Sequence, residues 1–307
     1  MAPLSNHHIL VTGGAGFIGS HLTDHLIPDN DVVVLDDFSS GDRSKVPDDA
    51  TIVDADIRDT EAVSRALEDV DTVFHQAALV SVAASIDAPT RSHAINVDGT
   101  LAVLEGAREV DARVVLASSA AIYGHPETVP VPESAPKTPA SPYGLEKLTI
   151  DHYARLYHER YGLEAVPLRY FNVYGPGQRG GDYSGVIDIF LEQARADAPI
   201  TVHGDGSQTR DFVHVEDVVR ANVLAATTDA VGRAYNVGTG SSVTVVELAE
   251  LIRDATDSSS EIVHTGARDG DIDQSRADLS RSRNTLGYEP TVALRDGIAD
   301  LVAHRTK

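Results

Sequence analysis

The 307-residue sequence contains no cysteine, no tryptophan and only one methionine. Without cysteine the chain can form no disulfide, offer no thiolate nucleophile and hold no Cys-ligated zinc or iron–sulfur cluster. No apolar run approaches the roughly 18 residues of a membrane-spanning helix. The start, MAPLSNHHIL, also lacks the basic region and apolar core of a signal peptide. We therefore expect a cytoplasmic protein without membrane partners, whose chemistry uses oxygen, nitrogen or a bound cofactor.

Lysine is scarce as well, because the chain has only Lys45, Lys137, Lys147 and Lys307. There are 47 acidic residues against 25 basic ones, and the formal net charge is -22. Such a charge repels the phosphates of nucleic acids and of anionic membranes, so neither is an expected partner. An acidic, lysine-poor composition is typical of proteins that work in molar salt. A merely acidic mesophilic enzyme is the alternative interpretation.

Short apolar runs alternate with helix-length segments over the first half of the chain. These runs occupy residues 8–12, 31–37, 51–57, 71–78, 112–119 and 164–172. β-branched runs that are apolar on both faces predict a parallel sheet covered by helices, that is, an α/β doubly wound fold of the Rossmann type. After residue 172 the pattern loosens, and Thr244 and Glu247 have the spacing of a helix capping box. We expect a Rossmann domain over 1–172, to which later segments return, and a smaller α/β substrate domain over 173–307.

A glycine-rich turn, VTGGAGFIGSHL, joins the first predicted strand to a helix. Gly13, Gly16 and Gly19 let the backbone approach a pyrophosphate, which the free amides and the dipole of a helix N-terminus favour. A helix-packing turn would show the same glycines. Asp36, however, ends the next strand about 20 residues on, where a carboxylate holds the adenosine ribose and repels the 2′-phosphate of NADP. NAD is therefore the expected cofactor, with Asp37 as the alternative ribose ligand.

The segment SPYGLEK places Tyr143 and Lys147 four residues apart on a predicted helix. Residues at that spacing share one helix face, so the ammonium can lie near the phenol and lower the pKa of the phenol toward the working pH. An exposed tyrosine and an exposed lysine would have the same spacing. Ser118 and Ser119 end a preceding strand, and ligands of open α/β sheets bind at such strand ends. Together these side chains predict a site for proton transfer.

Seven motifs extend this interpretation to the whole chain: VTGGAGFIGS, FHQAA, ASSAAIYG, SPYGLEK, RYFNVYGPGQ, TRDFVHVEDV and YNVGTG. In this order and at these separations they resemble the extended short-chain dehydrogenase/reductase family, and within it the group of UDP-glucose 4-epimerases. The resemblance implies Tyr143 as the acid and base of the reaction. It implies Lys147 as the tuner of Tyr143 and as a ribose ligand, and Ser119 as the hydroxyl partner of the reacting sugar oxygen.

The resemblance also implies where two ligands bind. The NAD contacts it implies are Gly13, Gly16, Phe17, Ile18, Gly19, Asp36, Asp37, Asp56, Ile57, Ala77, Asn96, Ser118, Tyr143 and Lys147. The contacts it implies for a UDP-sugar are Ser119, Tyr143, Asn172, Val186, Arg210, Arg268 and Ser275. Asn96 is expected to support Lys147 through the backbone. Two alternatives stay open, because Asp56 would also suit a surface turn and Arg210 would also suit a salt bridge with a neighbouring acid.

The residues after Ser119 distinguish reactions within the family. Relatives that eliminate water carry an Asp-Glu pair there, and decarboxylases keep a glutamate at the second position, whereas this chain has Ala120 and Ala121. The resemblance therefore implies 4-epimerisation through a transient 4-keto sugar. A dTDP-sugar or UDP-uronate epimerase is the nearest alternative. A non-catalytic NAD-binding sensor would be expected to have lost Tyr143 or Lys147.

Three further expectations concern the range of substrates, the oligomeric state and metal binding. By resemblance Ser275 walls the sugar pocket and leaves room for an N-acetyl group, although a one-residue slip would put Gln274 there. We also expect a homodimer built from the helix at about 90–110 and the helix that carries Tyr143. The 13 histidines lack the paired spacing beside acids that zinc sites show, so no metal is expected.

The composition predicts that the protein needs salt. Diluting it from molar to low salt should lower its melting temperature, because unscreened carboxylates repel one another more strongly in the folded chain. Thermal unfolding followed by circular dichroism across a salt series measures this. A melting temperature that stays constant or rises as salt is withdrawn would favour the merely acidic mesophilic enzyme.

Overall fold

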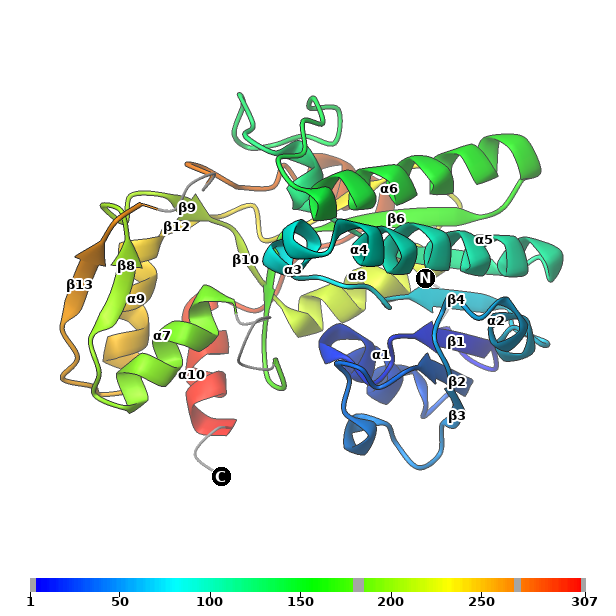
Figure 1. Cartoon of the computed structure of the whole chain (residues 1–307), viewed down its shortest axis with the longest axis horizontal. Coiled ribbons are helices and arrows are strands. Elements are labelled where there is room, and N and C mark those ends of the chain that lie inside the picture. Colours follow the sequence, from blue (N-terminus) through cyan, green and yellow to red (C-terminus); the bar gives the residue numbers. More distant parts are fainter. Residues whose placement is uncertain (1–3, 179–184, 268–271, 305–307) are drawn as a thin grey trace.

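The computed structural model describes residues 4–178, 185–267 and 272–304, which form a larger and a smaller unit (Figure 1). The larger unit is built on a seven-stranded parallel sheet. Across the sheet its strands are, in order, β11 (Tyr235–Val237), β6 (Ala165–Tyr170), β5 (Arg113–Ser119), β4 (Thr72–His75), β1 (His8–Thr12), β2 (Asp31–Asp36) and β3 (Thr51–Asp54). This arrangement confirms the predicted α/β doubly wound fold.

Helices cover both faces of the sheet, because successive side chains of a strand point to opposite faces. In β1, Ile9 and Val11 belong to one buried cluster and Leu10 to the other. The first cluster lies under α1 (Phe17–Leu26) and α8 (Val215–Thr227); the second lies under α2 (Thr60–Ala66), α5 (Gly99–Glu109) and α6 (Pro142–Tyr161). Burial on both faces is the physical reason for the uninterrupted apolar runs of the sequence.

The smaller unit consists of chain that follows residue 172. Its core lies between α7 (Val186–Arg195), α9 (Val245–Ala255) and α10 (Leu294–His304) and the parallel pair β8 (Ile200–His203) and β13 (Ile262–Thr265). Thr244 and Glu247 form the predicted capping box at the start of α9. Because β11 and α8 belong to the larger unit, the chain passes between the units more than once. The division into two domains at residue 172 stays a prediction.

Short elements make up the rest of the described ranges. The strand β7 (Asn172–Tyr174) pairs in parallel with β10 (Phe212–His214), and β9 (Thr209–Arg210) pairs antiparallel with β12 (Val243–Thr244). The short helices are η1 (Arg43–Lys45), α3 (Val82–Asp87), α4 (Pro89–His93), η2 (Ala94–Asp98), η3 (Ala120–Tyr123) and η4 (Ser282–Leu286). None of the helices in the described ranges has both the length and the apolarity to span a membrane.

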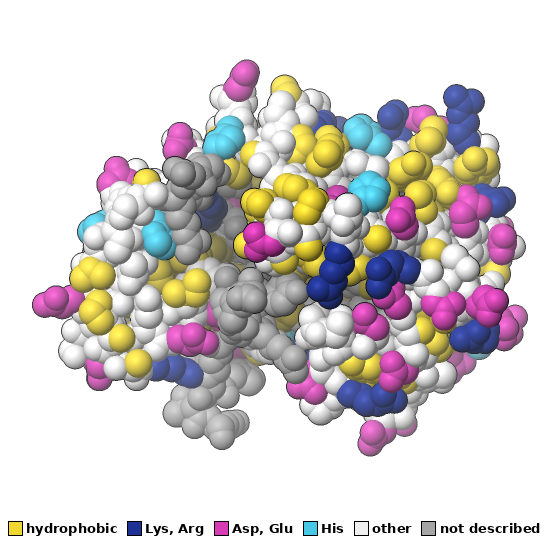
Figure 2. Space-filling view, in the orientation of Figure 1, with side chains coloured by type: hydrophobic (Ala, Val, Ile, Leu, Met, Phe, Trp, Pro, Cys, Tyr) yellow, Lys and Arg dark blue, Asp and Glu magenta, His cyan; other side chains and the backbone are white. Residues whose placement is uncertain are grey.

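Acidic side chains are scattered over both units on the face shown in Figure 2. Some form exposed ion pairs, such as Arg43 with Asp54 at 3.0 Å and Arg108 with Glu105 at 2.7 Å. Exposed pairs of this kind contribute little to stability. With 47 acidic and 25 basic residues, a large excess of carboxylates has no basic partner of its own.

One fully buried carboxylate, that of Asp211, connects segments of both units. Its Oδ1 accepts hydrogen bonds from the Thr239 amide at 2.8 Å and hydroxyl at 2.7 Å. Its Oδ2 accepts from the amides of Gly240 and Ala277, both at 3.0 Å. The carbonyl of Asp211 accepts from the amide and the side chain of Asn172, each at 3.0 Å. A single residue thus holds the end of the large sheet, β7 and the segment around Ala277 together.

Replacing Asp211 should therefore destabilise the whole chain. Asp211→Ala leaves three buried amide groups without an acceptor and should lower the free energy of unfolding by about 4 kcal/mol. The matched control is Asp205→Ala, because Asp205 accepts comparable bonds from Ser207 in an exposed turn. That variant should lose less than about 1 kcal/mol. Equal losses in urea unfolding of the two variants would contradict the structural role of Asp211.

Candidate active site

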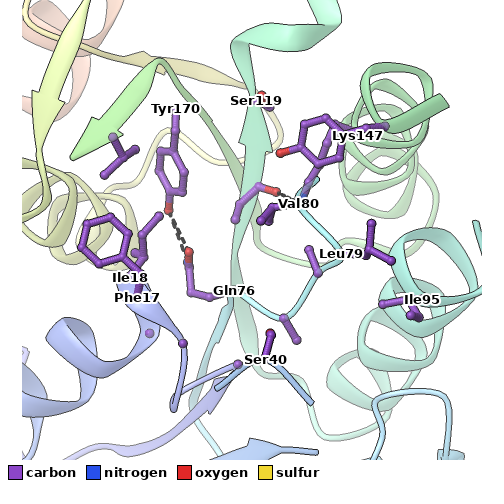
Figure 3. Close-up of a pocket in the computed structure, with 18 of the residues that line it drawn as sticks. Phe17, Ile18, Ser40, Gln76, Leu79, Val80, Ile95, Ser119, Lys147 and Tyr170 are labelled. Atoms are coloured by element: carbon purple, nitrogen blue, oxygen red, sulfur yellow. Dashed lines mark hydrogen bonds between the residues drawn. The ribbon is translucent and has the colours of Figure 1, made fainter. Parts of the chain in front are cut away.

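A cavity of about 480 Å³ opens at the carboxyl ends of the strands of the large sheet (Figure 3). The predicted site residues that line it are Gly13, Gly16, Phe17, Ile18, Gly19, Asp36, Asp37, Asp56, Ile57, Ala77, Ser118, Ser119, Tyr143, Lys147, Asn172 and Val186. They come from segments far apart in the sequence, and the parallel sheet brings their strand ends to one edge.

The glycine turn leaves a place for a ligand at the start of α1. Gly13 has a φ of +70°, and a Cβ added there would lie 2.6 Å from the amide nitrogen of Ala77. A Cβ at Gly19 would collide with the carbonyl of Gly13. No side chain caps α1 at Gly16. A bare backbone turn at an uncapped helix N-terminus fits the pyrophosphate of a dinucleotide.

Asp36 and Asp37 both line the cavity but are bound differently. The buried carboxylate of Asp36 accepts from the amides of Ala15 at 3.0 Å and Phe38 at 2.8 Å, and burial raises its pKa. The exposed carboxylate of Asp37 accepts instead from the amide and hydroxyl of Ser39, at 3.0 and 2.6 Å. The geometry favours Asp36 as the ribose ligand. Asp36 also has a role that the sequence did not indicate, because it fixes the glycine turn through its hydrogen bond with the Ala15 amide.

The environment of Asp56 is compatible with both roles that the sequence left open. Its carboxylate accepts two hydrogen bonds from the Nε of Arg58, at 2.9 and 3.0 Å, and the side-chain hydrogen bonds of Arg58 lower its pKa. Asp56 is thus an ion-paired acid near the surface. It also lines the cavity beside Ile57, and its contact with NAD stays a prediction.

Tyr143, Lys147 and Ser119 lie together at the end of β5 and the start of α6. The phenol of Tyr143 lies close enough to the hydroxyl of Ser119 for that hydroxyl to act on its pKa, and both side chains line the cavity. The Nζ of Lys147 donates to the carbonyl of Ala117 at 2.8 Å and lies 5.9 Å from the centroid of the Tyr143 ring. Ser141 fixes the first turn of α6 by accepting from the amide of Gly144 at 3.1 Å. The sequence spacing thus brings a phenol, a hydroxyl and an amine into one wall of the cavity (Figure 3).

The direction of the Tyr143 pKa shift differs from the one expected from this spacing. Removal from water raises the pKa of the phenol to about 12, although the nearby Ser119 hydroxyl opposes the rise. Removal from water also lowers the pKa of Lys147 to about 8. In the protein by itself, desolvation outweighs the attraction of the amine. The pKa of Tyr143 without a bound cofactor therefore lies above its ordinary value, and the lowering expected from Lys147 together with a bound cofactor stays a prediction.

Asn96 lies behind the cavity wall rather than in it. Its Oδ1 accepts from the Leu79 amide at 2.8 Å, and its Nδ2 donates to the Leu79 carbonyl at 3.0 Å and to Glu146 at 2.7 Å. Leu79 itself lines the cavity. The bonds of Asn96 therefore support the β4–α3 loop and Glu146, the residue directly before Lys147, and its expected support of Lys147 through the backbone stays a prediction.

The predicted contacts of the sugar nucleotide are only partly in the cavity. Asn172 and Val186 line it. Arg210 does not, and its NH1 donates to the carbonyls of Thr209 at 2.8 Å and Ile272 at 2.5 Å. The carboxylate of its neighbour Asp211 accepts hydrogen bonds from Thr239, Gly240 and Ala277. These placements bring Arg210 beside the segment that begins at Ile272.

Two further predicted contacts, Arg268 and Ser275, stand on either side of Ile272 in the sequence. Arg268 is outside the described residues. Ser275 donates its amide to the Thr209 carbonyl at 3.1 Å and is not among the lining residues. Gln274, the alternative to Ser275, forms a β-bridge with Thr209. The proposed wall of the sugar pocket at Ser275 stays a prediction.

A polar group on the cavity floor was missed by the sequence analysis. Gln76 donates to the hydroxyl of Tyr170 and to Asn222, both at 3.2 Å, and Tyr170 and Asn222 are bonded at 3.0 Å (Figure 3). Burial raises the pKa of Tyr170 to about 12, which keeps its hydroxyl protonated. Gln76 and Tyr170 stand at strand ends, which was the available signal. Their partner on α8 could not be found from spacing.

Metal binding has no obvious place in the part of the chain that the structure describes. No group of three or more His, Asp or Glu side chains there could hold an ion. The cavity offers backbone amides, hydroxyls, a phenol and an amine instead. Such groups suit an organic cofactor with phosphates and a polar substrate.

Comparison with known proteins gives the same picture. The sequence matches the NAD dependent epimerase/dehydratase family over residues 9–238. "Putative UDP-glucose 4-epimerase" of Methanocaldococcus jannaschii is 40% identical over 298 residues, which are 96% of this chain and 97% of that protein. "UDP-glucuronic acid decarboxylase 1" of Arabidopsis thaliana is 34% identical over 96% of this chain and 69% of that protein.

Two solved structures are similar over nearly the whole chain. That of UDP-N-acetylglucosamine 4-epimerase from Methanobrevibacter ruminantium, in complex with UDP-N-acetylmuramic acid, gives a TM-score of 0.95 at 35% identity and covers 99% of each chain. That of UDP-glucose 4-epimerase from Thermotoga maritima, with UDP-glucose, gives 0.94 at 38% identity and covers 97% of this chain and 98% of the other.

Proposed function

Since the chain belongs to the NAD dependent epimerase/dehydratase family, we propose that it interconverts UDP-glucose and UDP-galactose by inverting carbon 4. One observation carries this proposal. Ser119, Tyr143 and Lys147 line the same cavity as the glycine turn and Asp36. A dinucleotide and the hydroxyl of a sugar can therefore meet in one site.

The cofactor of the family is NAD, and the residues of this chain fit it. The glycine turn and the start of α1 suit the pyrophosphate, and Asp36 suits the hydroxyls of the adenosine ribose. The carboxylate of Asp36 also disfavours the 2′-phosphate of NADP. Held by these residues, NAD would supply the acceptor and donor for the hydride of carbon 4.

Tyr143 moves the proton in the proposed reaction. Its oxygen takes the proton of the sugar 4-hydroxyl and later returns it, while Ser119 holds the same sugar oxygen. Because removal from water raises the pKa of Tyr143 to about 12, ionising it near neutral pH requires positive charge in the cavity. Lys147, with a pKa lowered to about 8, supplies part of that charge when protonated.

Inversion also requires that the sugar presents both faces to the same tyrosine. The nucleotide must then be held while the hexose turns, which assigns binding to the diphosphate contacts and chemistry to Tyr143 and Ser119. The proposed holders are Asn172 and Val186, which line the cavity, together with Arg210 and Arg268. Their roles rest on the family resemblance.

The residues that follow Ser119 support epimerisation over elimination or decarboxylation. In η3, Ala120 and Ala121 occupy the positions where relatives with those activities carry carboxylates. The amide of Ala121 donates to the Ser119 hydroxyl at 3.1 Å, so the methyl groups lie directly beside the catalytic group. A dTDP-sugar or UDP-uronate 4-epimerase is the nearest alternative, and a non-catalytic NAD-binding sensor a more distant one. Incubation with UDP-glucose, dTDP-glucose and UDP-glucuronate, followed by separation of the products, distinguishes them.

Tyr143→Phe tests the assigned chemistry. It removes only the oxygen that moves the proton, so turnover of UDP-glucose should fall by about a hundredfold or more while NAD stays bound. Tyr161→Phe, at the exposed end of the same helix, is the control and should retain full activity. If Tyr143→Phe keeps activity within tenfold of the parent, another group transfers the proton.

Substrate breadth depends on the residue proposed to wall the sugar pocket. A serine at 275 leaves space for an N-acetyl group and offers it a hydroxyl, so UDP-N-acetylglucosamine should also be epimerised. Ser275→Tyr should suppress that substrate and spare UDP-glucose. Gln274→Tyr is the matched control for the neighbouring register. Equal loss of both substrates in Ser275→Tyr, or no reaction of UDP-N-acetylglucosamine with the parent, would exclude Ser275 as the gate.

We also propose a homodimer formed through α5 and α6. Leu145, Leu156 and Tyr161 of α6 are 57%, 41% and 59% exposed, and hydrophobic side chains lie over these helices on the face in Figure 2. Contact between two copies would cover them. Light scattering at micromolar concentration should give twice the mass of the chain, and the mass of one chain would contradict the proposal.

A further inference from the structure

Two side chains of the larger unit hold a short turn that leads into the smaller unit. This turn, residues 175–178, is called the strap below. The Nε2 of His21 in α1 is bonded to the carbonyl of Pro176 at 2.8 Å. The Nζ of Lys45 in η1 donates to the carbonyl of Gly177 at 2.6 Å. Because a carbonyl only accepts, His21 carries a proton on Nε2.

The strap has a fixed shape. Gly175 has a φ of +156° and Gly177 a φ of +80°, and a Cβ at Gly175 would lie 2.5 Å from the side chain of Val215. The amide of Gln178 donates back to the Gly175 carbonyl at 3.4 Å. Pro176 restricts the backbone further. The strap thus packs against α8 and presents two carbonyls to His21 and Lys45.

The strap stands between two hollows. Gln178 lines the cavity proposed for the cofactor, as do Val173 and Tyr174 just before the strap. Pro176 and Gly177 line a second hollow, of about 440 Å³, together with His21 and Lys45. The strap is therefore part of the cavity wall, and its two bonds lie on the far side of that wall. Figure 1 shows α1 on the side of the larger unit that faces the smaller one.

Both holding residues are tied to the glycine turn. The amide of Lys45 donates to the carbonyl of Asp42, whose amide donates in turn to the Ala15 carbonyl, both at 2.9 Å. The ring of His21 meets the ring of Phe17 edge-on, with centroids 5.8 Å apart. The elements that suit the pyrophosphate are thus the same elements that hold the strap.

From this geometry we propose that His21 and Lys45 are positioning residues that keep the strap closed against bound NAD. The dinucleotide would then leave only after both bonds open. The proposal rests on the NAD site of the proposed function. It explains why a chain with so few lysines places one where it meets a backbone carbonyl rather than a phosphate.

The rate at which NAD leaves tests this role. The holoenzyme is loaded with radiolabelled NAD, and loss of label is followed in excess unlabelled NAD. Lys45→Met and His21→Phe should each release NAD about tenfold faster, because each loses a hydrogen bond from a strong donor. Lys137→Met is the matched control, since its Nζ donates to the Glu133 carbonyl at 2.7 Å within one segment. His25→Phe is the control on α1, where His25 is exposed.

The possible outcomes distinguish the proposed role of the strap from the proposed NAD site itself. Faster release in both strap variants, with control rates and melting temperatures like the parent's, supports the proposal. Release rates equal to those of the controls overturn it, while the NAD site stands. Faster release that is matched by an equal fall in melting temperature assigns the bonds to folding and also overturns it. If the parent takes up no NAD, the proposed function fails and the strap's role fails with it.

Discussion

The arrangement of the segments around Asp211 depends on the hydrogen bonds that its carboxylate accepts. A buried carboxylate is tolerated only when its oxygens are fully bonded, and here three backbone amides and one hydroxyl meet that need. Burial raises the pKa of Asp211, and the hydrogen bonds oppose the rise. Since the amides belong to Thr239, Gly240 and Ala277, their segments cannot move independently. The neighbouring Arg210 and Asn172 take their positions from the same arrangement.

Helix α6 carries the proposed catalytic residues, and it is likewise held in place by a buried carboxylate. The face that carries Tyr143 and Lys147 turns to the cavity. Further along the helix, Asp151 forms a buried ion pair with Arg169 of β6 at 2.9 Å and accepts from Ser118 at 3.1 Å. A buried ion pair is costly to break, because each partner would leave an uncompensated charge behind. The helix is thus fixed to the strand ends that form the floor of the site.

Sequence patterns predicted those parts of the structure that local rules determine. The parallel sheet follows from β-branched runs, the glycine turn from the strand before it, and the capping box from Thr244 and Glu247. Tyr143 and Lys147 followed from helical spacing. Contacts between distant segments left no such signal, because periodicity reports which face is buried and not which partner covers it. Gln76 and Asn222, 146 residues apart, are an example.

The same limit applies to the details of the predicted site. Helical spacing placed an amine near the Tyr143 phenol, but it carried no information about how much water the fold removes from that phenol. The resemblance implied that Asn96 supports Lys147 through the backbone, but it gave no indication of the bonds that the Asn96 amide makes to Leu79 and Glu146. The pKa of a buried group and the contacts behind the cavity wall depend on how the surrounding side chains pack. Both can be described only once the folded structure is known.

The acidic character of the chain bears on how it would retain its cofactor. A surface with a net charge of -22 opposes a bound dianion, and in molar salt the attraction of exposed lysines and arginines for phosphate is screened. Backbone amides at a helix start are fixed in place at short range and are screened much less. A ligand that is enclosed by a fixed chain segment is retained whatever the net charge of the protein. A glycine turn combined with the strap at 175–178 is therefore a form of retention that suits this composition better than a cluster of basic side chains.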